Sequence, residues 1–179
     1  MSTIIQWNCH GSPSRKAELE RFLSLQIHLP YILCLQGSFL NKNNPDFSIR
    51  GYTTERSDRT QGQNGGLVIL IKTGLNYVPL PNPTSLEAMV IRVKLQSGDV
   101  TLVNVYHAPN TPFDKDEYER LFQQYHSNSI ILGDFNAYST VFGADRTDAR
   151  GRVIENLLDD SNVVVLNMES ARISIVVAR

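Results

Sequence analysis

The chain has 179 residues, of which 41% are hydrophobic and 20% are charged, and its formal net charge at pH 7 is −1. These values are ordinary for a globular protein with one substantial core, so we expect a single domain over residues 1–179. A net charge near zero excludes a protein-wide field that attracts nucleic acid, so binding to DNA would depend on local basic clusters.

The apolar segments give no sign of a membrane protein. Polar residues follow Ile4 and Ile5 within a few positions, unlike a signal peptide, and no apolar run is long enough to cross a membrane. We therefore expect an intracellular protein, nuclear or cytoplasmic, without a membrane partner. Cys9 and Cys34 lie in apolar segments and lack the spacing of a zinc motif, so we predict free buried thiols.

The first half of the chain combines strands with one helix. In chain order the predicted elements are a strand at 3–9, a helix at 14–28, and strands at 31–36, 51–56 and 67–72. The helix is predicted from apolar residues at helical spacing, namely Leu19, Phe22, Leu23 and Ile27. Ser12 is its expected N-cap, with Pro13 in the first turn. Further on, Asn64-Gly65-Gly66 suits a tight connection with positive φ.

The second half adds strands and two more helices. The predicted elements are a Pro-rich loop at 79–83, strands at 86–95 and 99–106 joined by a hairpin, a helix near 118–125, a strand at 130–132, a helix near 153–158, a strand at 163–167 and an apolar stretch at 173–177. Several strands are consecutive, and three helices are interleaved with them. This order favours two packed sheets with helices outside, an α+β protein or four-layer sandwich.

The segment from Ser129 to Ala137 stands at the centre of this pattern. Its buried strand ends on Gly133, and Asp134 and Asn136 follow directly. A carboxylate and an amide therefore leave the end of the sheet together, where active sites of layered α/β proteins are often built. A plain turn is the alternative, because Asp, Asn and Gly are common turn residues.

Asn8, Tyr106 and His107 also stand where predicted strands end. If they converge with Asp134 and Asn136, the group has the metal ligands, water-orienting groups and hydrogen-bond donors that metal-dependent phosphodiester cleavage needs. Each of the three also has a simpler interpretation, with Asn8 as a strand cap, Tyr106 as a core residue and His107 as a surface histidine.

Six short motifs give the chain a family resemblance. In chain order they are Ile5-Gln6-Trp7-Asn8-Cys9-His10-Gly11, Cys34-Leu35-Gln36, Gly65-Gly66-Leu67-Val68-Ile69, Val103-Asn104-Val105-Tyr106, Gly133-Asp134-Phe135-Asn136-Ala137 and Arg150-Gly151-Arg152. With them the chain resembles the endonuclease/exonuclease/phosphatase superfamily, and most of all the apurinic-endonuclease-like domain of LINE-type (non-LTR) retrotransposons. The resemblance implies a four-layer αββα sandwich that cuts DNA with a divalent metal ion, usually Mg²⁺.

The resemblance also implies roles for individual residues. Asn8 would help to position the metal ion, and Tyr106 would contact the scissile phosphate. Asp134 would orient or activate the attacking water, and Asn136 would stabilise the transition state.

Three arginines are candidate phosphate contacts, because guanidinium groups suit phosphate oxygens. They are Arg146, Arg150 and Arg152, in or just after a loop from Tyr138 to Arg150 that the resemblance implies lies near DNA. The alternative is a solvated face at the start of a helix.

The chain departs from the family pattern at two places. After the second strand the family has Leu-Gln-Glu, whose Glu is the main metal ligand, but here the position is Gly37. Because Gly37 brings no side-chain oxygen, we expect weak Mg²⁺ binding. The family's C-terminal Ser-Asp-His block also has no counterpart, so we expect a domain truncated at its C-terminus, and loss of a catalytic group typically costs orders of magnitude in rate.

These departures leave alternative functions open. The first is a LINE-type endonuclease domain with weak or no activity, and the second is an inactive relative that binds nucleic acid or protein. A phosphatase of the same superfamily is a third alternative that rests on fold alone. Truncation would also uncover a sheet edge, so we expect either that residues 173–177 partly fill it or that the protein self-associates.

Overall fold

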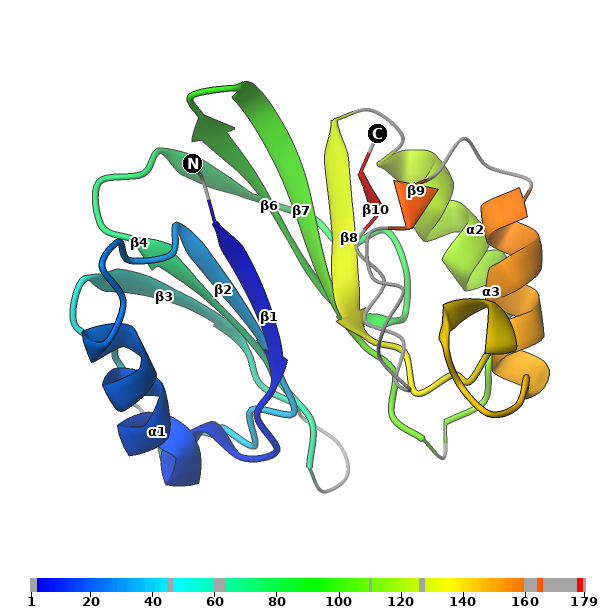
Figure 1. Ribbon diagram of the computed structural model, residues 1–179, viewed down its shortest axis with the longest axis horizontal. Helices are drawn as coiled ribbons and strands as arrows, with labels where there is room; N and C mark the ends of the chain where they lie inside the picture. The colour runs from blue at the N-terminus through cyan, green and yellow to red at the C-terminus, as the bar shows by residue number, and fades with distance from the viewer. Residues whose placement is uncertain are drawn as a thin grey trace.

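The structure is a computed structural model that describes residues 3–44, 47–59, 64–109, 111–125, 128–159, 164–165 and 177–178. Two sheets pack face to face (Figure 1). The helix α1 (Ser12–Ser24) lies outside the first sheet, and α2 (Lys115–Gln124) and α3 (Ala149–Asp159) lie outside the second. The predicted four-layer αββα sandwich is therefore confirmed.

The first sheet has four strands in the order β1 (Ile4–Asn8), β2 (Ile32–Gln36), β4 (Leu67–Lys72) and β3 (Tyr52–Ser57). β1 and β2 are parallel, because α1 carries the chain back between them, whereas β4 is antiparallel to both of its neighbours. Every residue of β2 is buried, as expected for a continuously apolar strand that is covered on both faces.

The second sheet has the order β5 (Tyr77–Leu80), β6 (Glu87–Leu95), β7 (Gly98–Tyr106), β8 (Ser129–Asp134), β10 (Val177–Ala178) and β9 (Val164–Val165). β6 and β7 form the predicted hairpin, whereas β7 and β8 are parallel and are connected through α2. β10 pairs with β8, so Val177 at the end of the predicted apolar stretch extends this sheet. Residues 173–176 lie outside the described part of the chain.

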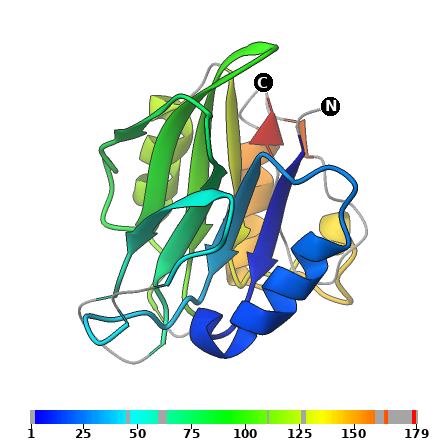
Figure 2. The ribbon, with the colours of Figure 1, turned by 90° about the vertical axis from the view of Figure 1, so that its left-hand side faces the viewer.

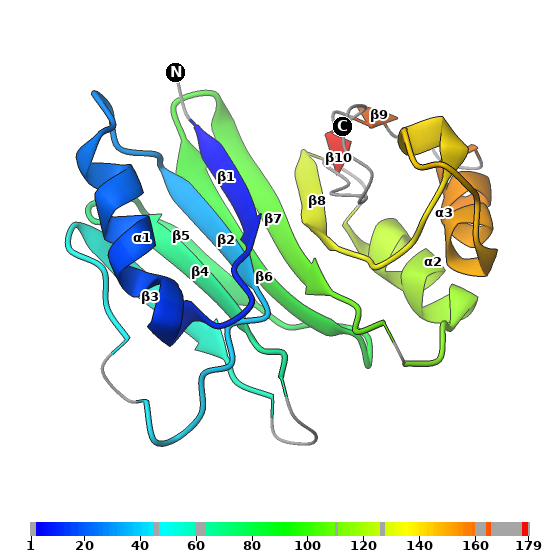
Figure 3. The ribbon, with the colours of Figure 1, turned by 60° about the horizontal axis from the view of Figure 1, so that its bottom comes forward.

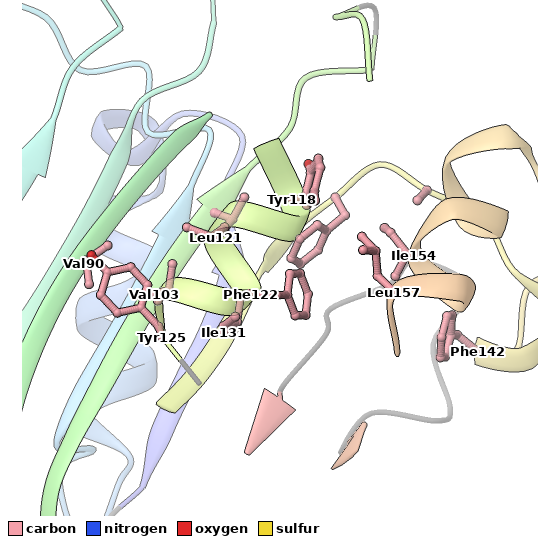
Figure 4. Close-up of a cluster of buried hydrophobic side chains, with 13 residues drawn as sticks. Val90, Val103, Tyr118, Leu121, Phe122, Tyr125, Ile131, Phe142, Ile154 and Leu157 are labelled. Carbon is pink, nitrogen blue, oxygen red and sulfur yellow. The ribbon is translucent and has the colours of Figure 1, made fainter. Parts of the chain in front are cut away.

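Three apolar cores fill the spaces between the four layers. One lies between α1 and the first sheet, and a second lies between the two sheets. In the third core, Tyr118 and Leu121 of α2 are fully buried together with Ile131 of β8 and Ile154 of α3 (Figure 4). Burial of this apolar surface is the main stabilising contribution to such a sandwich.

The start of α1 differs from the prediction. Gly11, not Ser12, is the N-cap, and it adopts a left-handed backbone conformation with φ of 109° that glycine tolerates without strain. Ser12 lies inside the helix, where its hydroxyl group donates a hydrogen bond to Ser38 O at 3.0 Å. The serine therefore joins the helix to the loop after β2.

The end of α1 also differs from the prediction, since the helix stops at Ser24 rather than at residue 28. Leu25 N–H donates to Phe22 O, a three-residue spacing that tightens the last turn and ends the α-helical pattern. Ile27 consequently lies beyond the helix and is 94% exposed, and Phe22 is 40% exposed. The prediction that the helix continues to residue 28 was wrong.

The Pro-rich segment was also predicted wrongly as a loop throughout, because Pro79 lies within β5. A proline is tolerated there because β5 is an edge strand, and its outer side needs no backbone donor.

Other local predictions are confirmed. Asn64, Gly65 and Gly66 all have positive φ, and Cys9 and Cys34 are buried free thiols. None of the described helices has the length and apolar character of a membrane span.

Candidate functional site

Three strands carry predicted site residues to the same end of the sandwich. Asn8, Tyr106 and Asp134 are the last residues of β1, β7 and β8, respectively. Tyr106 and Asp134 are direct partners in the parallel register of β7 and β8. Figure 3 looks toward this end, where the three strands finish. Asn136 follows two residues after Asp134.

Hydrogen bonds join three of these residues. The Asn8 side-chain amide donates a short hydrogen bond to Asp134 Oδ2, and Asn136 N–H donates to Asp134 Oδ1 at 3.0 Å. Asn136 Nδ2 in turn donates to His107 O at 3.1 Å. Both oxygens of the buried Asp134 carboxylate therefore accept hydrogen bonds, and the predicted convergence of Asn8, Asp134 and Asn136 is observed.

Gly133 allows β8 to reach this position. It has a φ of 149°, and a Cβ atom built on it would overlap the carbonyl group of Val105, its register partner in β7. Any side chain at this position would push β7 and β8 apart. The glycine therefore sets the approach of the two strands that present Tyr106 and Asp134.

Gly37 stands immediately after β2, beside Asn8. It has a φ of 60°, and a Cβ atom at this position would lie 3.0 Å from Asn8 Oδ1. A longer side chain built there would thus begin next to the Asn8 amide, but glycine supplies no oxygen ligand.

The side chains at this end do not fit a Mg²⁺ site. Asn8 donates an N–H group to Asp134 Oδ2, and Gly37 adds no carboxylate. Within the described residues no group of three or more His, Cys, Asp or Glu side chains is placed to hold a metal ion. Mg²⁺ prefers carboxylates together with water at near-octahedral geometry, and this donor set offers a single carboxylate already occupied by two hydrogen bonds.

Tyr106 is half-buried and has a charged neighbour. The guanidinium carbon of Arg59 lies 5.6 Å from the centre of the Tyr106 ring, within the range of a cation–π interaction. Arg59 is held by Glu87, the residue opposite Tyr106 on β6, and Glu87 also accepts a short hydrogen bond from Gly66 N–H. Burial and the Asp134 carboxylate raise the pKa of Tyr106, whereas Arg59 opposes this shift. The phenol is therefore neutral near pH 7.

His107 is a buried residue that is only 5% exposed, so its interpretation as a surface histidine was wrong. Its Nε2 lies 3.3 Å from Thr111 O, which can only accept, and its Nδ1 lies 2.7 Å from the Tyr118 hydroxyl. Nε2 therefore carries the proton, and Tyr118 donates to Nδ1. Burial and the nearby Arg150 cation lower the pKa of His107. The ring is a neutral structural link between β7 and α2.

The three candidate phosphate-binding arginines are in different environments. Arg150 donates to the carbonyl oxygens of Ala108, Pro109, Thr111 and Asn136. Arg146 and Arg152 are exposed, and the guanidinium carbon of Arg146 lies 5.8 Å from the Tyr138 ring centre. Arg150 thus fastens the loop after β7, whereas the other two are accessible to a ligand; phosphate contact by any of them stays a prediction.

A pocket of about 540 Å³ opens beside Tyr106. Its lining includes Arg59, Glu87, Tyr106, Asp114 and Glu117. The carboxylates outnumber the cation, which is unfavourable for a polyanion inside the pocket.

Sequence patterns did not identify several polar groups around the site. Arg59 and Glu87 are 28 residues apart, and no motif connects them. A chain of amides also joins the two sheets. Gln6 donates to Gln36 Oε1 at 2.5 Å within the first sheet, and the buried Gln36 donates to Asn104 Oδ1 of the second sheet at 2.6 Å. The polar residue Asn104 within the apolar strand β7 was the available signal for that chain.

Comparisons with known proteins give related matches. The family model described as endonuclease-reverse transcriptase matches residues 100–176. The chain is 25% identical over 164 residues to the probable RNA-directed DNA polymerase from transposon X-element of Drosophila melanogaster. It is 26% identical over 163 residues to the RNA-directed DNA polymerase from mobile element jockey of Drosophila funebris. Each alignment covers 89% of this chain, which spans only 18% of either relative.

Solved structures share the fold. The endonuclease domain of TRAS1, a telomere-specific non-LTR retrotransposon, superposes with a TM-score of 0.78 at 21% identity, covering 98% of this chain and 82% of that domain. The AP endonuclease LMAP from Leishmania major superposes with a TM-score of 0.70 at 16% identity, covering 91% of this chain and 67% of that enzyme.

Proposed function

We propose that this chain, which has the fold of the endonuclease/exonuclease/phosphatase superfamily and resembles the endonuclease-like domain of LINE-type retrotransposons, is a DNA-binding domain of that lineage with little or no nicking activity. The main observation in support of this proposal is Gly37. It stands beside the Asn8–Asp134 pair, where the family has its metal-binding Glu, and it supplies no ligand. We expect the protein to act inside the cell, where its nucleic-acid partner is found.

The few oxygen ligands beside Gly37 support weak metal binding. The Asn8 amide donates through Nδ2 to Asp134, so Asn8 Oδ1 and the Asp134 carboxylate are the side-chain oxygens at this place, and Gly37 adds none. A cation here would have to give up hydration water with little compensation from further carboxylates.

DNA binding is supported by the basic residues that remain accessible. Arg146 and Arg152 are exposed on the loop and helix that follow Asn136, and Arg150 ties the first turn of α3 to the Asn136 carbonyl group. Two exposed guanidinium groups in the segment that follows Asn136 suit contacts to a phosphate backbone. We expect modest affinity, because the chain has no overall positive charge. This affinity should fall with increasing salt in proportion to the number of phosphate contacts.

A plasmid-nicking assay tests the catalytic half of the proposal. The natural chain, incubated with supercoiled plasmid and Mg²⁺ or Mn²⁺, is expected to nick no faster than Asp134→Ala. Nicking by the natural chain that Asp134→Ala abolishes would overturn the proposal.

A second experiment measures metal binding directly and does not depend on activity. Calorimetry compares Gly37→Glu with its matched control Gly37→Gln. Tighter binding by Gly37→Glu alone is expected, since the pair differs only in charge.

Fluorescence anisotropy with a labelled DNA duplex tests the binding half. Arg146→Ala and Arg152→Ala should each weaken binding and reduce the slope of log affinity against log salt by about 1. Val141→Ala is a suitable control, because Val141 is exposed in the same loop and uncharged. Binding that is absent at low salt, or equal for all four proteins, would contradict DNA recognition by this surface.

A further inference from the structure

The edge strands of the two sheets differ in how well they are protected against pairing. Among the described residues these edges are β1, β3, β5 and β9. β3 carries the charged residues Glu55 and Arg56, β5 contains Pro79, and β9 has two residues. Charges, proline and short length are the usual features that prevent edge-to-edge association.

β1 has none of these protective features. Its sequence is Ile-Ile-Gln-Trp-Asn, without charge or proline, and all five residues are partly exposed. Figure 2 shows β1 in dark blue at one edge of the first sheet, with α1 lying across it. An apolar edge strand of this length that is neither charged nor bulged is a template for strand addition.

The main-chain groups on the free side of β1 can be identified from its pairing with β2. Cys9 N–H donates to Gln36 O, and Thr3 O accepts from Tyr31 N–H, so the odd-numbered residues of this segment face β2. The N–H and C=O groups of Ile4, Gln6 and Asn8 therefore point away from the sheet.

An apolar pocket lies beside the same edge. It has a volume of about 270 Å³ and is lined by Ile5, Trp7, Leu19, Phe22 and Leu33, together with Gln6 and Glu18. Ile5 and Trp7 pack toward the α1 core, whereas Gln6 and Asn8 hydrogen bond toward the space between the two sheets. The α1 side of the edge thus offers apolar surface.

We infer that a second copy of this chain docks here, with the two β1 strands antiparallel about a two-fold axis at Gln6. This register places Ile5 of one copy against Trp7 of the other, so both flanking pairs on the α1 side are apolar. Gln6 faces Gln6, and Ile4 faces Asn8, which aligns the outward main-chain groups for about six hydrogen bonds. An isologous contact needs such self-complementarity, and the β1 sequence has it. The result is a continuous eight-stranded sheet, counted from four strands in each copy.

Sedimentation velocity across a wide concentration range tests this inference with Gln6→Pro and Gln6→Ala. Both variants lose the Gln6 amide, but only proline removes the outward N–H, and the β1–β2 hydrogen bonds do not use that group. The natural chain and Gln6→Ala are expected to form dimers, and Gln6→Pro is expected to dimerise at least about tenfold more weakly. A natural chain that stays monomeric at every concentration, or equal dimerisation of the two variants, would overturn the inference.

A second measurement fixes the register and does not depend on the proline variant. Gln6 lies on the proposed axis, so Gln6→Cys should form a disulfide-linked dimer under mild oxidation. Val78→Cys is the matched control, because Val78 is 60% exposed on the β5 edge. Equal cross-linking of both variants would contradict a specific β1 contact. Neither experiment involves DNA or metal, so its outcome is separate from that of the proposed function.

Discussion

The two sheets contribute unequal halves to the candidate site. In the half from the second sheet, Asp134, Asn136 and His107 all have hydrogen-bond partners inside the fold. The half from the first sheet consists of Asn8 and Gly37, and it contributes one amide and no carboxylate. We therefore expect substitutions in the second half to lower the free energy of unfolding more than substitutions at Gly37 in the first half.

Among the substitutions that test this comparison, Gly133→Ala in the second half should cause the largest loss of stability. The added Cβ atom overlaps the Val105 carbonyl group, so β7 and β8 must separate, and we expect a loss of about 3 kcal/mol or more in the free energy of unfolding. Urea unfolding followed by circular dichroism measures it. Gly98→Ala is the control, because Gly98 also has positive φ, at 119°, but no atom lies within 4 Å of its Cβ position. Equal losses in the two variants would show that backbone conformation, not strand contact, determines the cost.

Arg150→Ala should have the next largest effect. It leaves the carbonyl groups of the loop after β7 without their charged donor, and a loss of about 2 kcal/mol is expected for hydrogen bonds of this kind. The measurement is again urea unfolding, with Arg152→Ala as an exposed control that should change stability by less than about 0.5 kcal/mol. If Arg152→Ala lowers the free energy of unfolding as much as Arg150→Ala does, the hydrogen bonds of Arg150 to the loop after β7 do not explain the loss.

His107 gives the second half a pH dependence. Burial and Arg150 lower the pKa of His107 in the folded state, so below about pH 6.5 the unfolded chain binds a proton that the folded chain does not. Stability is then fully present above the unfolded pKa and falls as the pH decreases toward the folded pKa. His107→Gln should lose this part of the pH dependence, and the exposed His28→Gln should keep it. Urea midpoints of both variants, measured at several pH values, test this expectation. If the midpoints of the two variants changed with pH in the same way, the assignment of the pH dependence to His107 would be wrong.

The sequence was sufficient to predict the layered fold, because the apolar runs and helical spacings that signal it are local. Convergence of Asn8, Asp134 and Asn136 also followed, since each stands at or just after the end of a strand. The partners of His107 and Arg150 could not be predicted. Burial of His107 depends on Tyr118 of α2, and the carbonyl groups that hold Arg150 come from a loop about 40 residues away.

The smallest expected effect is in the first half, at Gly37. With a φ of 60°, an alanine there should cost about 1 kcal/mol through the left-handed backbone, whereas Gly37→Asn should cost less, because asparagine tolerates this conformation. The nearest atom to the new Cβ is Asn8 Oδ1 at 3.0 Å, the end of a side chain that can move, unlike the fixed Val105 carbonyl at Gly133. Thermal unfolding of the two variants beside the natural chain measures the difference. A loss at Gly37→Asn as large as that at Gly133→Ala would contradict the comparison, because the first half would then be as much a part of the scaffold as the second.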